Sequence, residues 1–120
     1  VRDWTYVEDN AAAQWLVLTE AEPGSLYNVG AGNELTNREL TMRLLERFGV
    51  GEERIRRVAD RPGHDLRYSV DTTRIRALGW RPRVDLDEGL DRTIAFYRAR
   101  EDWWRPLKAA GASDRRGTSG

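Results

Sequence analysis

The chain has 120 residues, the size of one small domain, and 39% of them are hydrophobic and 33% charged. It contains no cysteine, which excludes disulfides, a thiolate nucleophile and a cysteine-based zinc site. No apolar run approaches the roughly 20 residues of a membrane span, and no secretory signal opens the chain. We therefore expect a soluble, cytoplasmic protein with no membrane partner.

Positive charge is concentrated in one segment, although the net charge is zero. Residues 54–83 contain nine arginines and three acidic residues. The planar guanidinium group suits phosphate better than other side chains do. A patch this small favours a small phosphorylated ligand, and the neutral net charge weighs against a nucleic-acid partner.

The first predicted helix begins near Glu8, because an acidic residue is favourable at the positive end of a helix. Ala11, Trp15 and Leu18 recur at helical spacing, so we expect them to line its buried face. Pro23-Gly24 ends this helix.

A short strand is predicted at residues 26–29, followed by Gly30-Ala31-Gly32. A dinucleotide-binding loop in this position needs a third glycine, which would stand at position 35, where the chain has Leu35. We therefore interpret the glycines as a tight turn, with the cofactor loop as the weaker alternative.

Thr36-Asn37-Arg38-Glu39 has the pattern of a capping box, and the helix that it starts should end at Gly49. The later elements are a weak strand, a Pro-Gly loop, a short helix and a long amphipathic helix, at residues 55–58, 61–65, 71–79 and from Asp85 or Asp87 to Tyr97. Two or three short strands cannot make an independent doubly wound sheet.

The residues of several catalytic sites are missing from the chain. Short-chain dehydrogenase chemistry uses a tyrosine four residues before a lysine, but the one lysine is Lys108 and position 104 is Trp104. The one histidine, His64, has no serine in a nucleophile turn near it, and a single histidine without cysteine does not favour a zinc site. We predict no catalytic residue and no metal ligand here.

Four segments and a chain ending carry a family resemblance. The segments are Arg2-Asp3-Trp4 through Val7-Glu8-Asp9, Tyr27-Asn28-Val29-Gly30 through Asn37, Arg61-Pro62-Gly63-His64-Asp65 with Arg67-Tyr68, and Leu78-Gly79-Trp80 with Pro82; Trp103-Trp104-Arg105-Pro106-Leu107 follows them. Together they resemble the dTDP-glucose 4,6-dehydratases of the extended short-chain dehydrogenase/reductase superfamily. The first two segments also recur in sugar-nucleotide epimerases and decarboxylases, whereas the third and the Trp-Trp ending point to the dTDP-glucose branch.

The resemblance implies an α/β fold class in which residues 1–108 form a carboxy-terminal, nucleotide-sugar-binding part, mainly helices with a few short strands. Residues 109–120 would be a disordered tail. The Rossmann half that binds NAD would lie outside the chain. The complete enzyme would be a homodimeric, NAD-dependent lyase of deoxysugar biosynthesis. It would convert dTDP-glucose into dTDP-4-keto-6-deoxyglucose and water, and the chain alone would be inactive.

Four residues would bind the substrate by this resemblance. Arg2 and Arg61 would hold the nucleotide diphosphate. Asn37, at the start of the capped helix, would bind the phosphate or nucleotide, where helix amides also favour anions. His64 would lie against the nucleotide or the diphosphate.

Each assignment has a plainer alternative. Arg2 could pair with Asp9, and Arg61 with Asp60 or Asp65. Asn37 could serve only the helix start, and His64 could be an ordinary loop residue. At the level of function, the alternatives are another NAD-dependent sugar-nucleotide epimerase or decarboxylase and a freestanding nucleotide-sugar-binding module. The choice between dTDP and UDP stays open.

Overall fold

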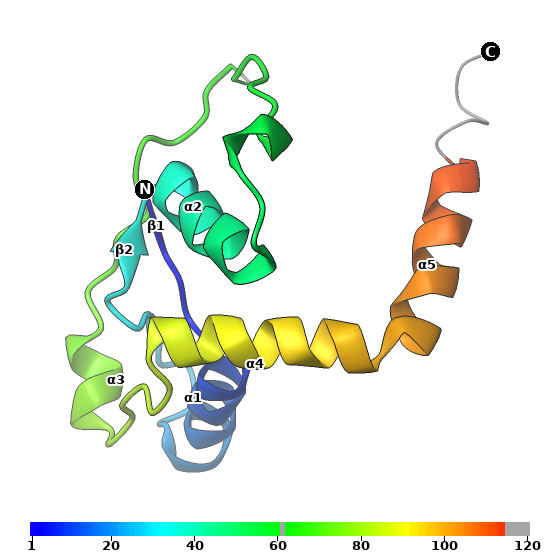
Figure 1. Cartoon of the computed structure of the whole chain (residues 1–120). Helices are drawn as coiled ribbons and strands as arrows, with labels where there is room; N and C mark the ends of the chain where they lie inside the picture. The colour runs from blue at the N-terminus through cyan, green and yellow to red at the C-terminus, as the bar shows by residue number, and fades with distance from the viewer. Residues whose placement is uncertain (61, 115–120) are drawn as a thin grey trace. The chain divides into compact units, whose positions relative to one another are not determined.

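The computed structural model describes residues 1–60 and 62–114. Its elements in chain order are β1 (Arg2–Asp3), α1 (Val7–Glu20), β2 (Glu34–Leu35), α2 (Asn37–Phe48), the 3-10 helix η1 (Glu52–Arg54), α3 (Thr73–Ala77), α4 (Leu86–Ala99) and α5 (Glu101–Asp114) (Figure 1). Helices thus dominate, with one short two-stranded sheet among the described residues, which confirms the predicted fold class. The chain divides into two compact units, and the second begins at Leu90.

The sheet joins the start of the chain to residues that precede α2. β1 and β2 are antiparallel, with Arg2 opposite Leu35 and Asp3 opposite Glu34. The predicted strands at 26–29 and 55–58 are wrong, because neither segment forms a strand in the described structure. A strand needs a neighbour for its backbone groups, and the pairing partner of β1 is β2.

Helix α1 buries a different face from the one predicted. Trp15 and Leu18 are 67% and 76% exposed, and Ala11 is exposed as well, so this prediction is wrong. Ala13 is fully buried instead, one helical turn after the buried Asp9.

Asp9 explains the orientation of α1. Its carboxylate accepts the backbone N–H groups of Arg83 and Val84, at 3.0 and 3.1 Å. Its backbone carbonyl accepts the indole N–H of Trp80 at 3.0 Å. A buried charge needs such partners, and here they turn the face with Asp9 and Ala13 inward.

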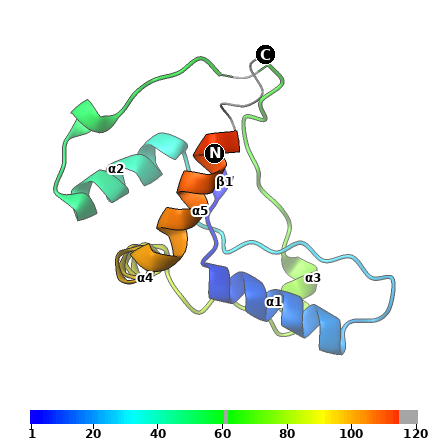
Figure 2. The same cartoon turned by 90° about the vertical axis from the view of Figure 1, so that its right-hand side faces the viewer.

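The core of the first unit combines residues of α1, of α3 and of the segment that follows α3; both helices lie in the lower part of Figure 2. It consists of Ala13, Ile75 and Trp80. Tyr27 and Val29, from the segment predicted to be a strand, pack against this core as coil. The alternating apolar side chains of this segment therefore pack against the core although its backbone pairs with no strand.

Helix α2 begins and ends as the sequence predicts. The Thr36 side chain accepts the Glu39 N–H at 3.1 Å while the Glu39 carboxylate accepts the Thr36 N–H at 2.7 Å, which confirms the capping box. Hydrogen bonds from Thr36 hold the pKa of the Glu39 carboxyl below its usual value. Gly49 ends the helix with φ at 64°, a left-handed conformation that suits glycine.

In the second unit, aromatic rings gather where α4 meets α5. Phe96 makes edge-to-face contacts with Tyr97 and Trp103, with ring centroids 5.6 and 5.8 Å apart. α5 continues to Asp114 and so includes the first six residues of the segment 109–120, for which a disordered tail is predicted. The alanines of this segment favour a helix. Residues 115–120 lie outside the described residues. None of the described helices is long and apolar enough to cross a bilayer.

Candidate functional site

Arg2, on β1, directly contacts two carbonyls, an imidazole and an aromatic ring. Its Nη1 donates to the Val1 carbonyl at 2.7 Å, and its Nη2 donates to the Asp65 carbonyl at 3.2 Å. Nη2 also lies 2.7 Å from His64 Nε2, and the guanidinium carbon stands 4.2 Å from the centre of the Tyr68 ring. No carboxylate among the described residues contacts Arg2. Asp9, the alternative partner of Arg2, instead accepts hydrogen bonds from the backbone N–H groups of residues 83 and 84, which precede α4.

The contacts of His64 fix its tautomer. An arginine can donate but not accept, so His64 Nε2 is the acceptor of the Arg2 hydrogen bond. The proton therefore sits on Nδ1, which contacts the Asp60 carboxylate. Asp60 and Arg2 together orient the ring, and the imidazole reaches Arg2 as a neutral group.

The loop that carries His64 is tied to both strands of the sheet. Tyr68 N–H donates to the Val1 carbonyl at 3.0 Å, next to Arg2 on β1. On the β2 side, Glu34 accepts a 2.6 Å hydrogen bond from Ser69 and pairs with Arg67. Figure 1 shows this long segment without regular structure passing the N-terminus between η1 and α3. These ties place residue 64 beside residue 2.

The glycine-rich turn holds a carboxylate of the chain itself. The N–H groups of Gly32 and Asn33 donate to the Asp3 carboxylate at 3.0 and 2.9 Å. A Cβ on Gly30 would stand 2.4 Å from Asp3 Oδ2, so the close approach requires glycine. The turn does not fit the diphosphate of NAD, since Asp3 already takes these two N–H groups. It fixes β1, and with it the start of the Arg2 side chain.

The other two predicted site residues have different outcomes. Asn37 is the first residue of α2, two positions after Leu35, the register partner of Arg2. It is exposed at the same end of the sheet, and its carbonyl accepts the Thr41 hydroxyl at 2.7 Å. Arg61 lies outside the described residues. The structure thus brings Arg2 and His64 into contact and places Asn37 on the adjoining helix start.

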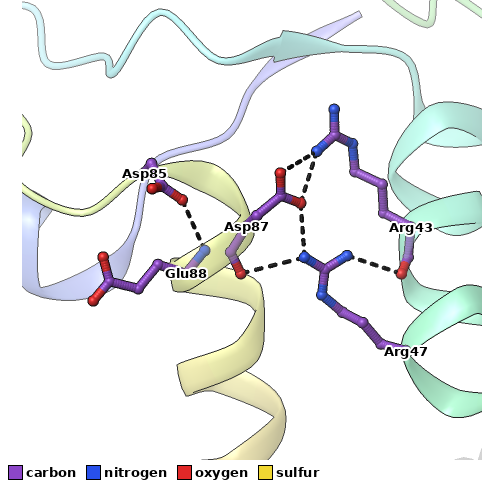
Figure 3. A network of polar contacts seen from close by, with 5 residues as sticks. All are labelled: Arg43, Arg47, Asp85, Asp87 and Glu88. Atoms are coloured by element: carbon purple, nitrogen blue, oxygen red, sulfur yellow. Dashed lines mark hydrogen bonds and ion pairs between the residues drawn. The ribbon is translucent and has the colours of Figure 1, made fainter.

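A second arginine cluster has a different composition (Figure 3). Arg43 and Arg47 of α2 point toward Asp87 in the first turn of α4. Arg43 Nη1 donates to the two Asp87 oxygens at 2.7 and 2.8 Å, and Arg47 Nη2 donates to Oδ1 at 2.7 Å. The hydrogen bonds from Arg43 and then Arg47 hold the pKa of the Asp87 carboxyl below its usual value. Both guanidinium groups are therefore ion-paired with the same carboxylate.

Comparison with known proteins assigns the family. The family described as GDP-mannose 4,6 dehydratase matches residues 1–93, most of the chain. The chain belongs to this family. It is 50% identical over 109 residues to a dTDP-glucose 4,6-dehydratase of Streptomyces antibioticus, an alignment that covers 90% of this chain and 32% of that relative. The predicted resemblance is confirmed.

Solved structures of this dehydratase family share the fold. A dTDP-glucose 4,6-dehydratase from Streptomyces venezuelae, solved with NAD bound, matches with a TM-score of 0.82 and 47% identity over 88% of this chain and 33% of its own. The enzyme from Bacillus anthracis, in complex with NAD, matches with a TM-score of 0.80 and 34% identity over the same shares. The chain spans about a third of the length of the relatives that it matches.

Three residues of the cluster around Arg2 and His64 are not among the site residues that the sequence predicts. They are Asp60, Asp65 and Tyr68, which contact His64 or Arg2. The sequence analysis names Asp60 and Asp65 only as possible ion-pair partners of Arg61. It names Tyr68 only as part of a segment that resembles the family. The signal that could have found them is the clustering of carboxylates and an aromatic ring around the single histidine.

Proposed function

We propose that this chain is the substrate-binding part of an NAD-dependent dTDP-glucose 4,6-dehydratase, a lyase that forms dTDP-4-keto-6-deoxyglucose and water. Within it, the site around Arg2 binds the nucleotide diphosphate. The observation that carries this proposal is the set of neutral partners around Arg2, which orient the guanidinium without neutralising it. A fixed guanidinium with no direct carboxylate partner among the described residues suits an anionic ligand.

The donors of Arg2 support this role. A guanidinium has five N–H groups, and three of them donate to Val1, His64 and Asp65. Among the described residues, Nε–H and one Nη1–H have no hydrogen-bond acceptor, and we propose that they donate to the ligand. A charge-assisted hydrogen bond contributes about 1.5–3 kcal/mol. We propose that Asn37 and Arg61 add to this grip, as the family resemblance implies.

The grip would act on rate through position. Binding energy gained at the nucleotide, remote from the reacting sugar, holds the sugar in the geometry for reaction. NAD, which the relatives from S. venezuelae and B. anthracis bind, would supply the oxidation and the return of hydride. We propose that NAD is held outside these 120 residues. The reason is that the one glycine-rich turn is occupied by Asp3 and no tyrosine precedes Lys108 by four positions.

The same account makes the chain alone inactive. Purified as residues 1–120 and given NAD and dTDP-glucose, it should form no keto-sugar. Keto-sugar formed at a rate above a buffer control would contradict the division of labour proposed here. We further propose, from the resemblance, that the complete protein is a cytoplasmic homodimer without nucleic-acid partners, which light scattering of the purified protein would test.

A substrate comparison tests the function itself. The complete reading frame is expressed and offered dTDP-glucose, UDP-glucose and GDP-mannose separately, with keto-sugar formation followed by absorbance after alkali treatment. The proposal predicts turnover of dTDP-glucose above the other two. Keto-sugar from GDP-mannose alone would support the activity in the family's description, and keto-sugar from UDP-glucose alone would favour a UDP-sugar dehydratase. Conversion of UDP-glucose without keto-sugar would favour an epimerase. Binding without any turnover would favour a freestanding module.

A further inference from the structure

Tyr68 lies against the face of the Arg2 guanidinium. The guanidinium carbon is 4.2 Å from the ring centre, inside the roughly 6 Å range of a cation–π contact. The ring is 47% exposed, so it does not serve as a core residue. We propose that Tyr68 is a positioning residue for the nucleotide diphosphate, acting through Arg2. The inference rests on the proposed function and names a residue that supports it.

The backbone of Tyr68 places the ring beside Arg2, and its hydroxyl links it to Asp65. Its N–H donates to the Val1 carbonyl at 3.0 Å. Because Val1 directly precedes Arg2, this hydrogen bond places the Tyr68 ring next to the Arg2 side chain. Its hydroxyl donates to the Asp65 carboxylate. The carbonyl of Asp65 accepts from Arg2 Nη2, so one residue restrains both the ring and the guanidinium.

The division of contacts on Arg2 explains why a ring suits this position. Hydrogen bonds occupy edges of a guanidinium, whereas an aromatic ring occupies its face. Tyr68 therefore restrains Arg2 without taking an N–H group that a phosphate could use. A carboxylate in the same place would restrain it too, but would also neutralise the charge, as Asp87 does for Arg43.

Four variants of the complete protein test this role: Tyr68→Leu, Tyr68→Phe, Arg2→Ala and the double variant Tyr68→Leu/Arg2→Ala. Thymidine diphosphate binding is measured by titration calorimetry, with thermal melting as the check on folding. We expect Tyr68→Leu to weaken binding about five-fold and Tyr68→Phe by less than about two-fold, since the ring makes the contact. In the Arg2→Ala background, Tyr68→Leu should change the Kd no further.

The outcomes separate this inference from the proposed function. If Tyr68→Leu weakens binding equally with and without Arg2, or if Tyr68→Phe is as weak as Tyr68→Leu, the positioning role is wrong while the proposed function stands. If the unsubstituted protein does not bind thymidine diphosphate, the proposed function fails and this role fails with it. Should Tyr68→Leu melt well below the parent, Tyr68→Gln takes its place in the same cycle.

Discussion

Two arginine clusters in the first unit show how partners decide what an arginine can do. Arg43 and Arg47 share the carboxylate of Asp87, and their charges are offset by it. Arg2 has the same side chain but donates to two carbonyls and a neutral imidazole, and its face lies on a ring. The first arrangement joins α2 to the start of α4. In the second, Arg2 has no direct carboxylate partner among the described residues.

The largest difference should come from Arg2→Ala in the complete protein. Loss of one charge-assisted contact should lower kcat/KM for dTDP-glucose about 10- to 100-fold. The melting temperature should change little, since the contacts that are lost join Arg2 to partly exposed groups at the edge of the sheet and involve no ion pair. Arg43→Ala is the matched control and should leave kcat/KM unchanged. Equal losses in the two variants would remove the distinction between the clusters.

Arg2→Lys sharpens the comparison by keeping the charge and losing the planar group. A lysine ammonium cannot reproduce contacts to Val1 and His64 and stack on Tyr68 at once. We expect about a three- to ten-fold rise in KM for dTDP-glucose, with kcat near the parent value. Full activity would mean that charge alone, without orientation, is sufficient.

The Asp87 cluster should affect stability and not binding. Arg43→Ala and Arg47→Ala remove ion pairs to Asp87, a carboxylate that is 58% exposed, and such pairs contribute little in water. Each should lower the melting temperature by about 1–4 °C, as thermal denaturation would show. Affinity for thymidine diphosphate should stay the same. A variant that binds more weakly while melting normally would place this cluster in the site.

The smallest effect concerns pH. Hydrogen bonds from Arg43 and Arg47 hold the pKa of the Asp87 carboxyl below its usual value of 3.8. The folded chain therefore binds the proton less readily, so the stabilisation is complete above about pH 4 and is lost as the pH falls through the lower, folded pKa. Asp87→Asn should show a shallower fall of melting temperature below about pH 4 than the parent. Parallel curves would mean that Asp87 contributes no pH dependence.

The parts of the fold that depend on neighbours in the sequence could be predicted. The capping box of α2 and its glycine end involve residues within a few positions of one another, and both are confirmed. The strand expected at 26–29 failed because strand pairing depends on a partner far along the chain. The prediction of the buried face of α1 was wrong for the same reason, since Asp9 accepts hydrogen bonds from the N–H groups of residues 83 and 84, far along the chain.

The site divides in the same way. The family resemblance singled out Arg2 and His64, and the structure places them in contact. Tyr68 was missed because its contact with Arg2 joins residues 66 positions apart in a segment without helix or strand periodicity. Asn37 lies at the expected helix start, and its role stays a prediction. Composition and spacing report which residues are present, whereas the pairing of residues 2, 64 and 68 depends on the folded loop.

The most direct test compares thymidine diphosphate with thymidine as ligands of the complete protein, with and without Arg2. Calorimetry gives the ratio of the two Kd values, which isolates what the protein gains from the phosphates. We predict that this ratio is large in the parent, falls at least about ten-fold in Arg2→Ala and is unchanged in Arg43→Ala. An unchanged ratio in Arg2→Ala would contradict the claim that the Arg2 cluster binds the diphosphate.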